Sequence, residues 1–184
     1  MLVQICGLPG SGKTTLAAAV ADAVSVVALR VDAIEAAMRR YGVAAAQSGI
    51  AAYAVMHAVA GPHLRRGQVV VADAVSPTVS AREGWVGTAA AHGAALRVVE
   101  VVCPDPVEHR RRVETRPADL PGFALPTWDD VRRAAREYEP RHDERLVVDS
   151  TRPVADVLPE VLAYLGLAPG TARGAAPSAD GGRL

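Results

Sequence analysis

The chain of 184 residues lacks several features that mark particular protein classes. Its two cysteines, Cys6 and Cys103, form no metal-ligand spacing and no disulfide framework, so we expect reduced, buried thiols. No apolar stretch approaches the roughly 20 residues that span a bilayer, and the amino terminus has no basic region typical of a signal peptide. The sequence therefore predicts a cytoplasmic protein that makes no use of a membrane.

An excess of charge of one sign is also missing. Lys+Arg and Asp+Glu each number 20, so the formal net charge is zero, and aromatic residues make up only 4% of the chain. This balance predicts no global attraction to nucleic acid or to an anionic membrane, and basic and aromatic residues are not interleaved. A nucleic-acid partner is therefore disfavoured, and any site for a polyanion must be local.

Lysine is almost absent, because Lys13 is the only one among the 20 basic residues. Switch-type GTPases read their base with an N-K-x-D motif, which a chain without a second lysine cannot contain. The D-x-x-G string at 119–122 lies in a proline-rich loop and does not follow a strand, so we interpret it as coincidental. The sequence thus excludes that class of GTPase.

What is present is an alternation of Val-rich apolar runs with helical segments. This pattern predicts one α/β domain with a five-stranded parallel sheet flanked by helices in three layers. We assign residues 1–167 to that domain, 112–145 to a lid and 168–184 to a disordered tail without a catalytic role. The expected strands are residues 2–6, 26–31, 69–73, 96–102 and 146–148. The expected helices are residues 13–24, 33–41, 51–66, 79–92, 106–116, 128–138 and 154–165.

The first turn of this pattern carries the strongest motif. Residues 7–14 read GLPGSGKT, a complete G-x-x-x-x-G-K-[ST] match between an apolar strand and a helix. Its glycines permit a backbone that points successive N–H groups at a phosphate, and we expect Lys13 on a solvent-facing loop to reach the β/γ-phosphates. The sequence predicts a P-loop NTPase fold that binds ATP. The expected nucleotide-binding residues in this segment are Gly7, Pro9, Gly10, Ser11, Gly12, Lys13, Thr14 and Thr15.

Two further residues predict a magnesium site. The Thr14 hydroxyl suits a Mg²⁺ ion that bridges phosphates. Asp73 ends the apolar string VVVAD, where P-loop proteins place the carboxylate that supports the metal. A plain turn aspartate is the alternative interpretation of Asp73.

Asp32 follows the second expected strand and is the candidate base. Strand carboxyl ends open onto the ligand crevice of a parallel sheet, so Asp32 would emerge on the same side as the phosphate loop and could accept the proton of an acceptor hydroxyl. The alternative is structural, because Asp32 with Glu35 three residues later has the pattern of a helix N-cap.

These motifs resemble a known family over residues 1–166. The strings GLPGSGKTT, VVVADAVSPTVSAREGW at 69–85 and RRRVETR at 110–116 are similar to those of small P-loop kinases, which include chloramphenicol phosphotransferase, gluconate kinase, adenylylsulfate kinase and AAA-domain kinases. The resemblance implies that Asp32 faces the acceptor, that Arg82 lies near the substrate and that Trp85 packs its helix. The sequence departs from the family at Ser76, where relatives often carry Asn.

The basic segment before the proline-rich loop predicts a phosphate clamp. Arg112 and Arg116 are four residues apart, so on one helix they would share a face, whereas Arg110 would point elsewhere. The pair matches the lid arginines of the resembled family, which act on phosphoryl charge. A solvated basic face is the alternative, and it is favoured for Arg110 and Arg111.

Other candidates have weaker signals. Arg152 and Pro153 follow the last strand, where the resembled family covers adenine, and a plain loop is the alternative. Tyr53 could line an acceptor site, as could Trp128, although core packing explains each. The five histidines form no metal pair, and we assign them to the surface or to packing.

The combined reading is an ATP- and Mg²⁺-dependent kinase that phosphorylates a hydroxyl group of a small molecule. Lys13, Asp32, Arg112 and Arg116 are the expected catalytic residues, and Asp32, Arg82 and Tyr53 are expected to contact the substrate. The protein would act as a monomer or homodimer. The alternatives are a nucleotide-binding module without phosphotransfer and a nucleic-acid 5′-hydroxyl kinase.

Overall fold

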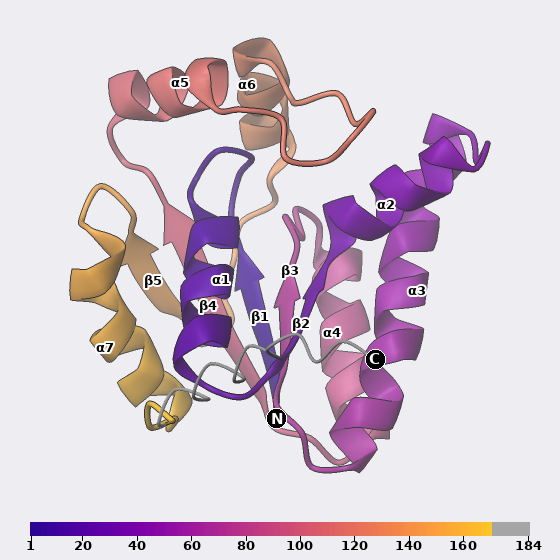
Figure 1. Cartoon of the computed structure of the whole chain (residues 1–184), viewed down its shortest axis with the longest axis vertical. Coiled ribbons are helices and arrows are strands. Elements are labelled where there is room, and N and C mark those ends of the chain that lie inside the picture. Colours follow the sequence, from indigo (N-terminus) through magenta and orange to yellow (C-terminus); the bar gives the residue numbers. More distant parts are fainter. Residues whose placement is uncertain (171–184) are drawn as a thin grey trace, which may run out of the picture.

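The computed structural model describes residues 1–170, in which a parallel sheet lies between two layers of helices (Figure 1). The strand order is β2-β3-β1-β4-β5, and every neighbouring pair is parallel. The predicted five-stranded parallel sheet is therefore confirmed. The strands are β1 (Leu2–Cys6), β2 (Val27–Arg30), β3 (Val70–Asp73), β4 (Leu96–Val102) and β5 (Leu146–Asp149).

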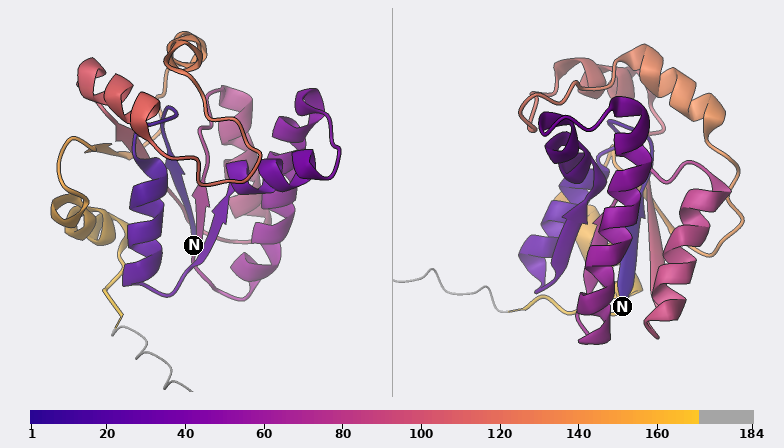
Figure 2. Two further views of the ribbon diagram at one scale, coloured as in Figure 1. Left: turned by 45° about the horizontal axis from the view of Figure 1, so that its top comes forward. Right: turned by 90° about the vertical axis from the view of Figure 1, so that its right-hand side faces the viewer.

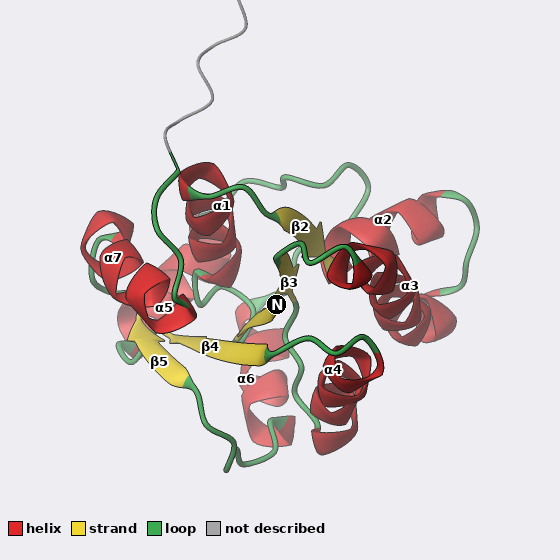
Figure 3. Cartoon of the chain, turned by 90° about the horizontal axis from the view of Figure 1, so that it is seen from below, coloured by secondary structure: helices red, strands yellow, loops and turns green. Residues whose placement is uncertain are grey.

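Alternate side chains of the central strand enter different apolar layers. Val3 and Ile5 pack with α1 (Lys13–Ala23) and α7 (Val154–Leu165). On the opposite face, the side chain of Leu2 packs with the helices α3 (Ala45–Arg65) and α4 (Val79–Ala91). Figure 3 shows the two helix layers on opposite sides of the sheet. Because both faces are covered, apolar residues predominate on both faces of the strands, and the polar residues Gln4 and Glu100 within them are themselves buried.

The remaining helices lie at the carboxyl ends of the strands. They are α2 (Val31–Arg40), α5 (Pro106–Thr115) and α6 (Trp128–Glu137). Figure 2 shows the connection between α5 and α6 running across this end of the sheet towards α2. Two contacts fasten it there: Arg30 is ion-paired with Asp119, and the Arg39 guanidinium carbon lies 5.1 Å from the centre of the Phe123 ring.

The predicted starts of α2 and α3 are wrong, and the start of α2 decides where Asp32 lies. The structure begins α2 at Val31 with Arg30 as its N-cap, two residues before the predicted start at 33, so Asp32 lies inside the helix. It begins α3 at Ala45, six residues before the predicted start at 51. Ser48 interrupts the apolar pattern there, but its buried hydroxyl donates to Glu35 Oε1 over 2.9 Å, a tertiary contact that the local pattern does not reveal.

The described chain ends beside the first helix, where the Gly170 amide donates to the Ala23 carbonyl over 3.0 Å. Residues 171–184, most of the predicted tail, lie outside the described residues. Within residues 1–170, no helix combines the length and the apolar character that crossing a bilayer requires.

Candidate functional site

The site begins with the glycine-rich turn between β1 and α1. Gly7, Gly10 and Gly12 have φ angles of 138°, 78° and 96°, a region that side chains rarely tolerate. Space is also limited, because a Cβ atom would come within 2.2 Å of the Val101 carbonyl oxygen at Gly7 and 2.4 Å of Val113 Cγ2 at Gly10. The close packing explains why this turn requires glycine.

The turn leaves the start of α1 without a side-chain cap. Gly12 is the N-cap residue and makes no side-chain hydrogen bond to the first turn. Free amides and the positive end of a helix dipole together form a site for an anion. The geometry therefore fits the phosphates of a nucleotide.

Lys13 is the first residue of α1, and the expectation that it lies on a solvent-facing loop is wrong. Only 6% of the residue is exposed. The structure holds no carboxylate within ion-pairing distance of its ammonium among the described residues. Lys13 lines the cavity described below, where an anion could pair with its ammonium, and phosphate oxygens would supply such a partner.

Thr14 and Asp73 meet at the carboxyl edge of the sheet, as the sequence predicted for a magnesium site. Thr14 Oγ1 donates to Asp73 Oδ2 over 2.7 Å. Asp73 Oδ1 is buried and has no hydrogen-bond partner among the described residues. Burial raises the pKa of Asp73, and the charge of Lys13 and the hydrogen bond from Thr14 oppose that shift. Since Mg²⁺ prefers oxygen ligands, this hydroxyl and carboxylate fit the ion.

A cavity of about 780 Å³ opens beside Thr14, and neither Asp73 nor Asp32 is among its lining residues. Five arginines and Lys13 line it, and Asp119 is the one carboxylate among its lining residues. Such a lining suits a polyanion. The arginines are Arg30, Arg111, Arg112, Arg116 and Arg152, and the predicted nucleotide-binding residues Gly10, Gly12, Thr14, Thr15 and Pro153 also line the cavity.

The other residues predicted in the phosphate loop support it from behind. Gly7 lies against Val101 of β4, and the Ser11 hydroxyl is buried without a hydrogen-bond partner among the described residues. The Pro9 carbonyl pairs with His109 Nε2 of α5 over 2.8 Å. His109 itself packs against Trp128 of α6, with ring centres 5.4 Å apart.

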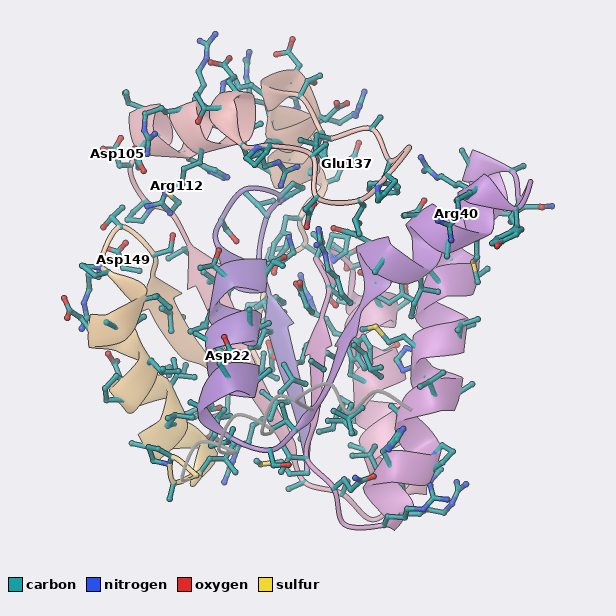
Figure 4. The ribbon with its side chains drawn as sticks, in the orientation of Figure 1. Asp22, Arg40, Asp105, Arg112, Glu137 and Asp149 are labelled. Carbon is teal, nitrogen blue, oxygen red and sulfur yellow. The ribbon has the colours of Figure 1, made fainter. Side chains whose placement is uncertain are left out.

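Arg112 and Arg116 both reach the cavity, although not by sharing a helical face. The helix α5 ends at Thr115, and Arg116 is its C-cap in an extended conformation, because Pro117 disfavours a helical residue before it. Arg112 donates to Glu108 Oε1 over 2.6 Å and to Ser150 Oγ over 3.0 Å. Figure 4 shows it reaching from α5 towards the end of β5 at Asp149. Arg110 is exposed and pairs with Glu114, as the solvated-face alternative predicted. Arg111, for which that alternative was also favoured, is exposed and pairs with Glu108 but also lines the cavity.

Asp32 lies in the first turn of α2 and makes no capping hydrogen bond. The alternative interpretation of Asp32 as an N-cap is wrong, because Arg30 holds that position. Glu35, the other half of the expected cap, instead pairs with Arg39 over 2.6 Å. The Asp32 carboxylate is about one-third exposed and lies 3.5 Å from Arg30 Nη2.

Arg30 is the residue that the sequence reasoning missed. It lies at the end of β2 and lines the cavity, and its guanidinium faces Asp32, Asp73 and Asp119. Burial lowers the pKa of Arg30, but the hydrogen bond to Asp119 and the neighbouring carboxylates outweigh that effect and raise it. A basic residue at the carboxyl end of a strand, two positions before Asp32, was the available signal.

Arg82 and Tyr53, predicted near the substrate, lie outside the lining of the main cavity and contact main-chain groups. Arg82 is buried and donates to the carbonyls of Ser76, Pro77, Glu139 and Pro140 over 2.6–3.2 Å. The Tyr53 hydroxyl accepts from the Ser76 amide over 3.0 Å. Ser76 has a φ of 51°, a conformation that Asn adopts more readily than most residues. These contacts fix the loop between β3 and α4.

A parallel sheet of order 2-3-1-4-5 with this glycine-rich turn between β1 and α1 defines a P-loop fold. Within that class the chain belongs to the AAA domain family, whose model matches residues 2–138. A search of curated proteins gave no match.

Solved structures with the same fold include several kinases. A sugar kinase from Janibacter sp. HTCC2649 is 18% identical with a TM-score of 0.68, over 91% of this chain and 95% of the other. A gluconokinase from Sinorhizobium meliloti 1021 is 20% identical with a TM-score of 0.63, over 90% of each chain. The Mycobacterium tuberculosis APS kinase in complex with AMPPNP and APS is 21% identical with a TM-score of 0.67, over 90% and 96%. The chain thus shares its fold with small P-loop kinases.

Proposed function

We propose that the protein is a kinase that transfers the γ-phosphoryl group of ATP to a hydroxyl group of a small molecule. The observation that carries this proposal is the Thr14–Asp73 hydrogen bond next to Lys13, because Thr14 and Lys13 also line a cavity that has five arginines in its lining. The named activities of the structural neighbours support it, since they are a sugar kinase, a gluconokinase and an APS kinase.

The donor would be held by the phosphate loop. The amides at the start of α1 and the Lys13 ammonium would bind the β- and γ-phosphates. Thr14 and Asp73 would hold Mg²⁺, which when bound neutralises phosphate charge. Arg152 and Pro153 line the far part of the cavity and would cover the base of the nucleotide.

The acceptor would approach beside Asp32. In the reaction, the acceptor oxygen forms a bond to the γ-phosphorus, the bond from that phosphorus to the β–γ bridging oxygen breaks, and the acceptor proton passes to the Asp32 carboxylate. Arg112 and Arg116 would stabilise the charge of the group in transfer. Arg112 is already oriented by Glu108 and Ser150, so it loses little freedom when it binds phosphate.

We also propose that residues 1–167 act as one domain, that part of residues 112–145 moves as a lid and that residues 168–184 take no part in catalysis. The contacts of residues 138–145 favour a lid that ends before Tyr138. Arg141 donates to Cys6 Sγ over 3.1 Å, and Arg145 pairs with Glu100 over 2.6 Å, so this stretch is bound to the sheet.

The test is a screen of hydroxyl compounds for ADP release above the basal rate with ATP and Mg²⁺. We expect at least one acceptor to stimulate turnover and to gain one phosphate, detected by mass. Nucleotide binding without any stimulation would favour a module that does not transfer phosphate. Phosphorylation confined to a nucleic-acid 5′ end, with steep salt dependence, would favour the polynucleotide kinase alternative.

A further inference from the structure

Arg30 has an unusual set of neighbours for a residue that ends a strand. Its Nη2 atom lies 3.5 Å from Asp32, the proposed base, and its Nε atom lies 3.9 Å from Asp73, the proposed metal-supporting residue. Both distances exceed that of a hydrogen bond, and Arg30 Nε is buried without a hydrogen-bond partner among the described residues. These two carboxylates therefore leave the hydrogen-bonding capacity of the guanidinium largely unused.

The direct hydrogen-bond partner of Arg30 comes from a distant part of the chain. Asp119, in the loop between α5 and α6, accepts from Arg30 Nη1. The Asp119 side chain is 51% exposed, whereas that of Arg30 is 22% exposed. An exposed carboxylate loses little when water replaces its partner, so this pair is weak by comparison with a buried one. Asp119 can be displaced by another anion at low cost.

A second guanidinium faces the same region. Arg116 lines the cavity, and its Nε atom is buried without a hydrogen-bond partner within residues 1–170. It lies close enough to Asp32, Asp119 and Arg30 for their charges to influence it. If Asp119 moved away, Arg30 and Arg116 would face the cavity, and the nearest carboxylates to Arg30 would be Asp32 at 3.5 Å and Asp73 at 3.9 Å.

We propose that Arg30, together with Arg116, binds an anionic group of a substrate and that the Asp119 carboxylate competes with that group for Arg30. A guanidinium in a cavity recognises carboxylate, phosphate or sulfate through paired N–H donors. The inference rests on the proposed function in one respect, the identity of the molecule that carries the anion. In a kinase the anion would be either the γ-phosphate of the nucleotide or an anionic group on the acceptor.

The experiment compares wild type with Arg30→Gln and Asp119→Asn. Calorimetry gives the Kd of ADP and of AMPPNP with Mg²⁺, and then the Kd of sulfate added to the AMPPNP complex. The two substitutions should act in opposite directions. Loss of the charged donors at Arg30 should weaken anion binding about 10-fold. Loss of the competing carboxylate at Asp119 should strengthen it about two- to five-fold.

Comparing the Kd of ADP with that of AMPPNP distinguishes the two possible sources of the anion, the γ-phosphate and the acceptor. If the γ-phosphate is the ligand, the two substitutions shift the Kd of AMPPNP in these opposite directions and leave that of ADP unchanged. If the acceptor carries the anion, neither nucleotide responds, but sulfate binds Asp119→Asn more tightly than wild type and Arg30→Gln more weakly. An anionic acceptor found in the screen should then show a raised KM with Arg30→Gln and partial recovery with Arg30→Lys.

Controls exclude general effects of lost charge. Arg40→Gln removes an exposed arginine from the last turn of α2, and Asp129→Asn removes an aspartate that is 90% exposed in α6. Both control variants should bind AMPPNP and sulfate with the affinities of wild type, and the melting temperatures of all variants that fold should also match wild type.

Equal affinities of wild type, Arg30→Gln and Asp119→Asn for AMPPNP and for sulfate would overturn the proposal and leave the proposed kinase activity standing. A wild-type protein that binds neither nucleotide would contradict the kinase, and sulfate would then be titrated into nucleotide-free wild type, Arg30→Gln and Asp119→Asn, where the same opposite shifts would still decide the anion site.

Discussion

Lys13 is the single lysine of the chain, and only 6% of the residue is exposed. No carboxylate lies within ion-pairing distance of it among the described residues, and it lines the arginine-rich cavity. An ammonium at the wall of a cavity, without an ion-pair partner, is free to bind an anion there. The position of Lys13 therefore favours a role in ligand binding over a role in the fold.

Lys13→Ala should abolish phosphotransfer and leave the melting temperature unchanged or higher. Removing one preorganised charge from a transferring phosphoryl group typically costs about 10²- to 10³-fold in rate. The measurement is ADP release with ATP and the best acceptor, together with thermal unfolding. Arg132→Ala, which removes an exposed charge from α6, is the matched control. Normal turnover by Lys13→Ala would refute the proposed function.

Replacing Asp32 should affect turnover far more than stability. Since its carboxylate caps nothing, Asp32→Asn should cost only the attraction to Arg30 and to the helix dipole, about 1 kcal/mol or less. A general base contributes about 10²- to 10⁴-fold, and a dissociative transition state, in which the proton leaves late, favours the lower end. Turnover should fall accordingly, while ATP affinity stays within a few-fold.

The readout for Asp32 is turnover at saturating ATP and acceptor. Asp156→Asn provides the control, because it removes an aspartate from the first turn of another helix, α7. A folded Asp32→Asn protein with unchanged turnover would show that the carboxylate neither accepts the proton nor orients the acceptor.

At the scale of elements, α5 and the phosphate loop are joined through one imidazole. His109 is buried, its Nε2 atom lies 2.8 Å from the Pro9 carbonyl oxygen, and Trp128 of α6 covers its ring. The glycine at position 10 lets α5 approach, since a Cβ there would collide with Val113. Because α5 packs directly on the glycine-rich turn, we expect a movement of α5 to change the shape of that turn.

His109→Leu should weaken AMPPNP binding about 10-fold, because a buried carbonyl that loses its partner costs about 1–3 kcal/mol and the loop relaxes to satisfy it. His109→Gln retains a side-chain N–H at a similar reach and should recover most of the affinity. Calorimetry on the two variants makes the comparison. Equal affinities for His109→Leu and wild type would show that the loop holds its shape without α5.

The hydrogen bonds of Arg82 also limit which part of the chain can move. The Arg82 guanidinium binds four carbonyls and joins the loop after β3 to residues 139–140. Nearby, Cys6 lies beneath Arg141, and burial raises the pKa of its thiol to about 11. This side of the sheet is held by several polar contacts, whereas the loop carrying Asp119 meets Arg30, at the end of β2, through an ion pair and Arg39, in α2, through a cation–π contact.

For the whole molecule, a chain that ends at Gly170 should fold and act as the full chain does. The truncation keeps the Gly170–Ala23 hydrogen bond and every residue of the proposed site. Residues 171–184 include only one large apolar residue, Leu184, so little burial is available to them. Melting temperature and stimulated ADP release are the measurements, and a large loss of either would show that these residues contribute to the domain.

The amino-acid sequence by itself determined the class of fold and the position of the glycine-rich turn in the candidate site. Val-rich runs and helical segments predicted the sheet, and the spacing of GLPGSGKT predicted the phosphate loop, because these features depend on residues that are neighbours along the chain. Thr14 and Asp73 were also predictable, since carboxyl ends of parallel strands meet at one edge.

Only the tertiary structure decided which residues from distant parts of the chain come into contact. Arg30 meets Asp119, His109 meets Pro9 and Arg141 meets Cys6 across 89, 100 and 135 residues of sequence. No periodicity or spacing encodes such pairs, because they form when separate elements pack and bring distant side chains together. For the same reason the apparent N-cap at Asp32 was misleading: the local pattern fits a cap, but β2 ends early enough for α2 to start before it.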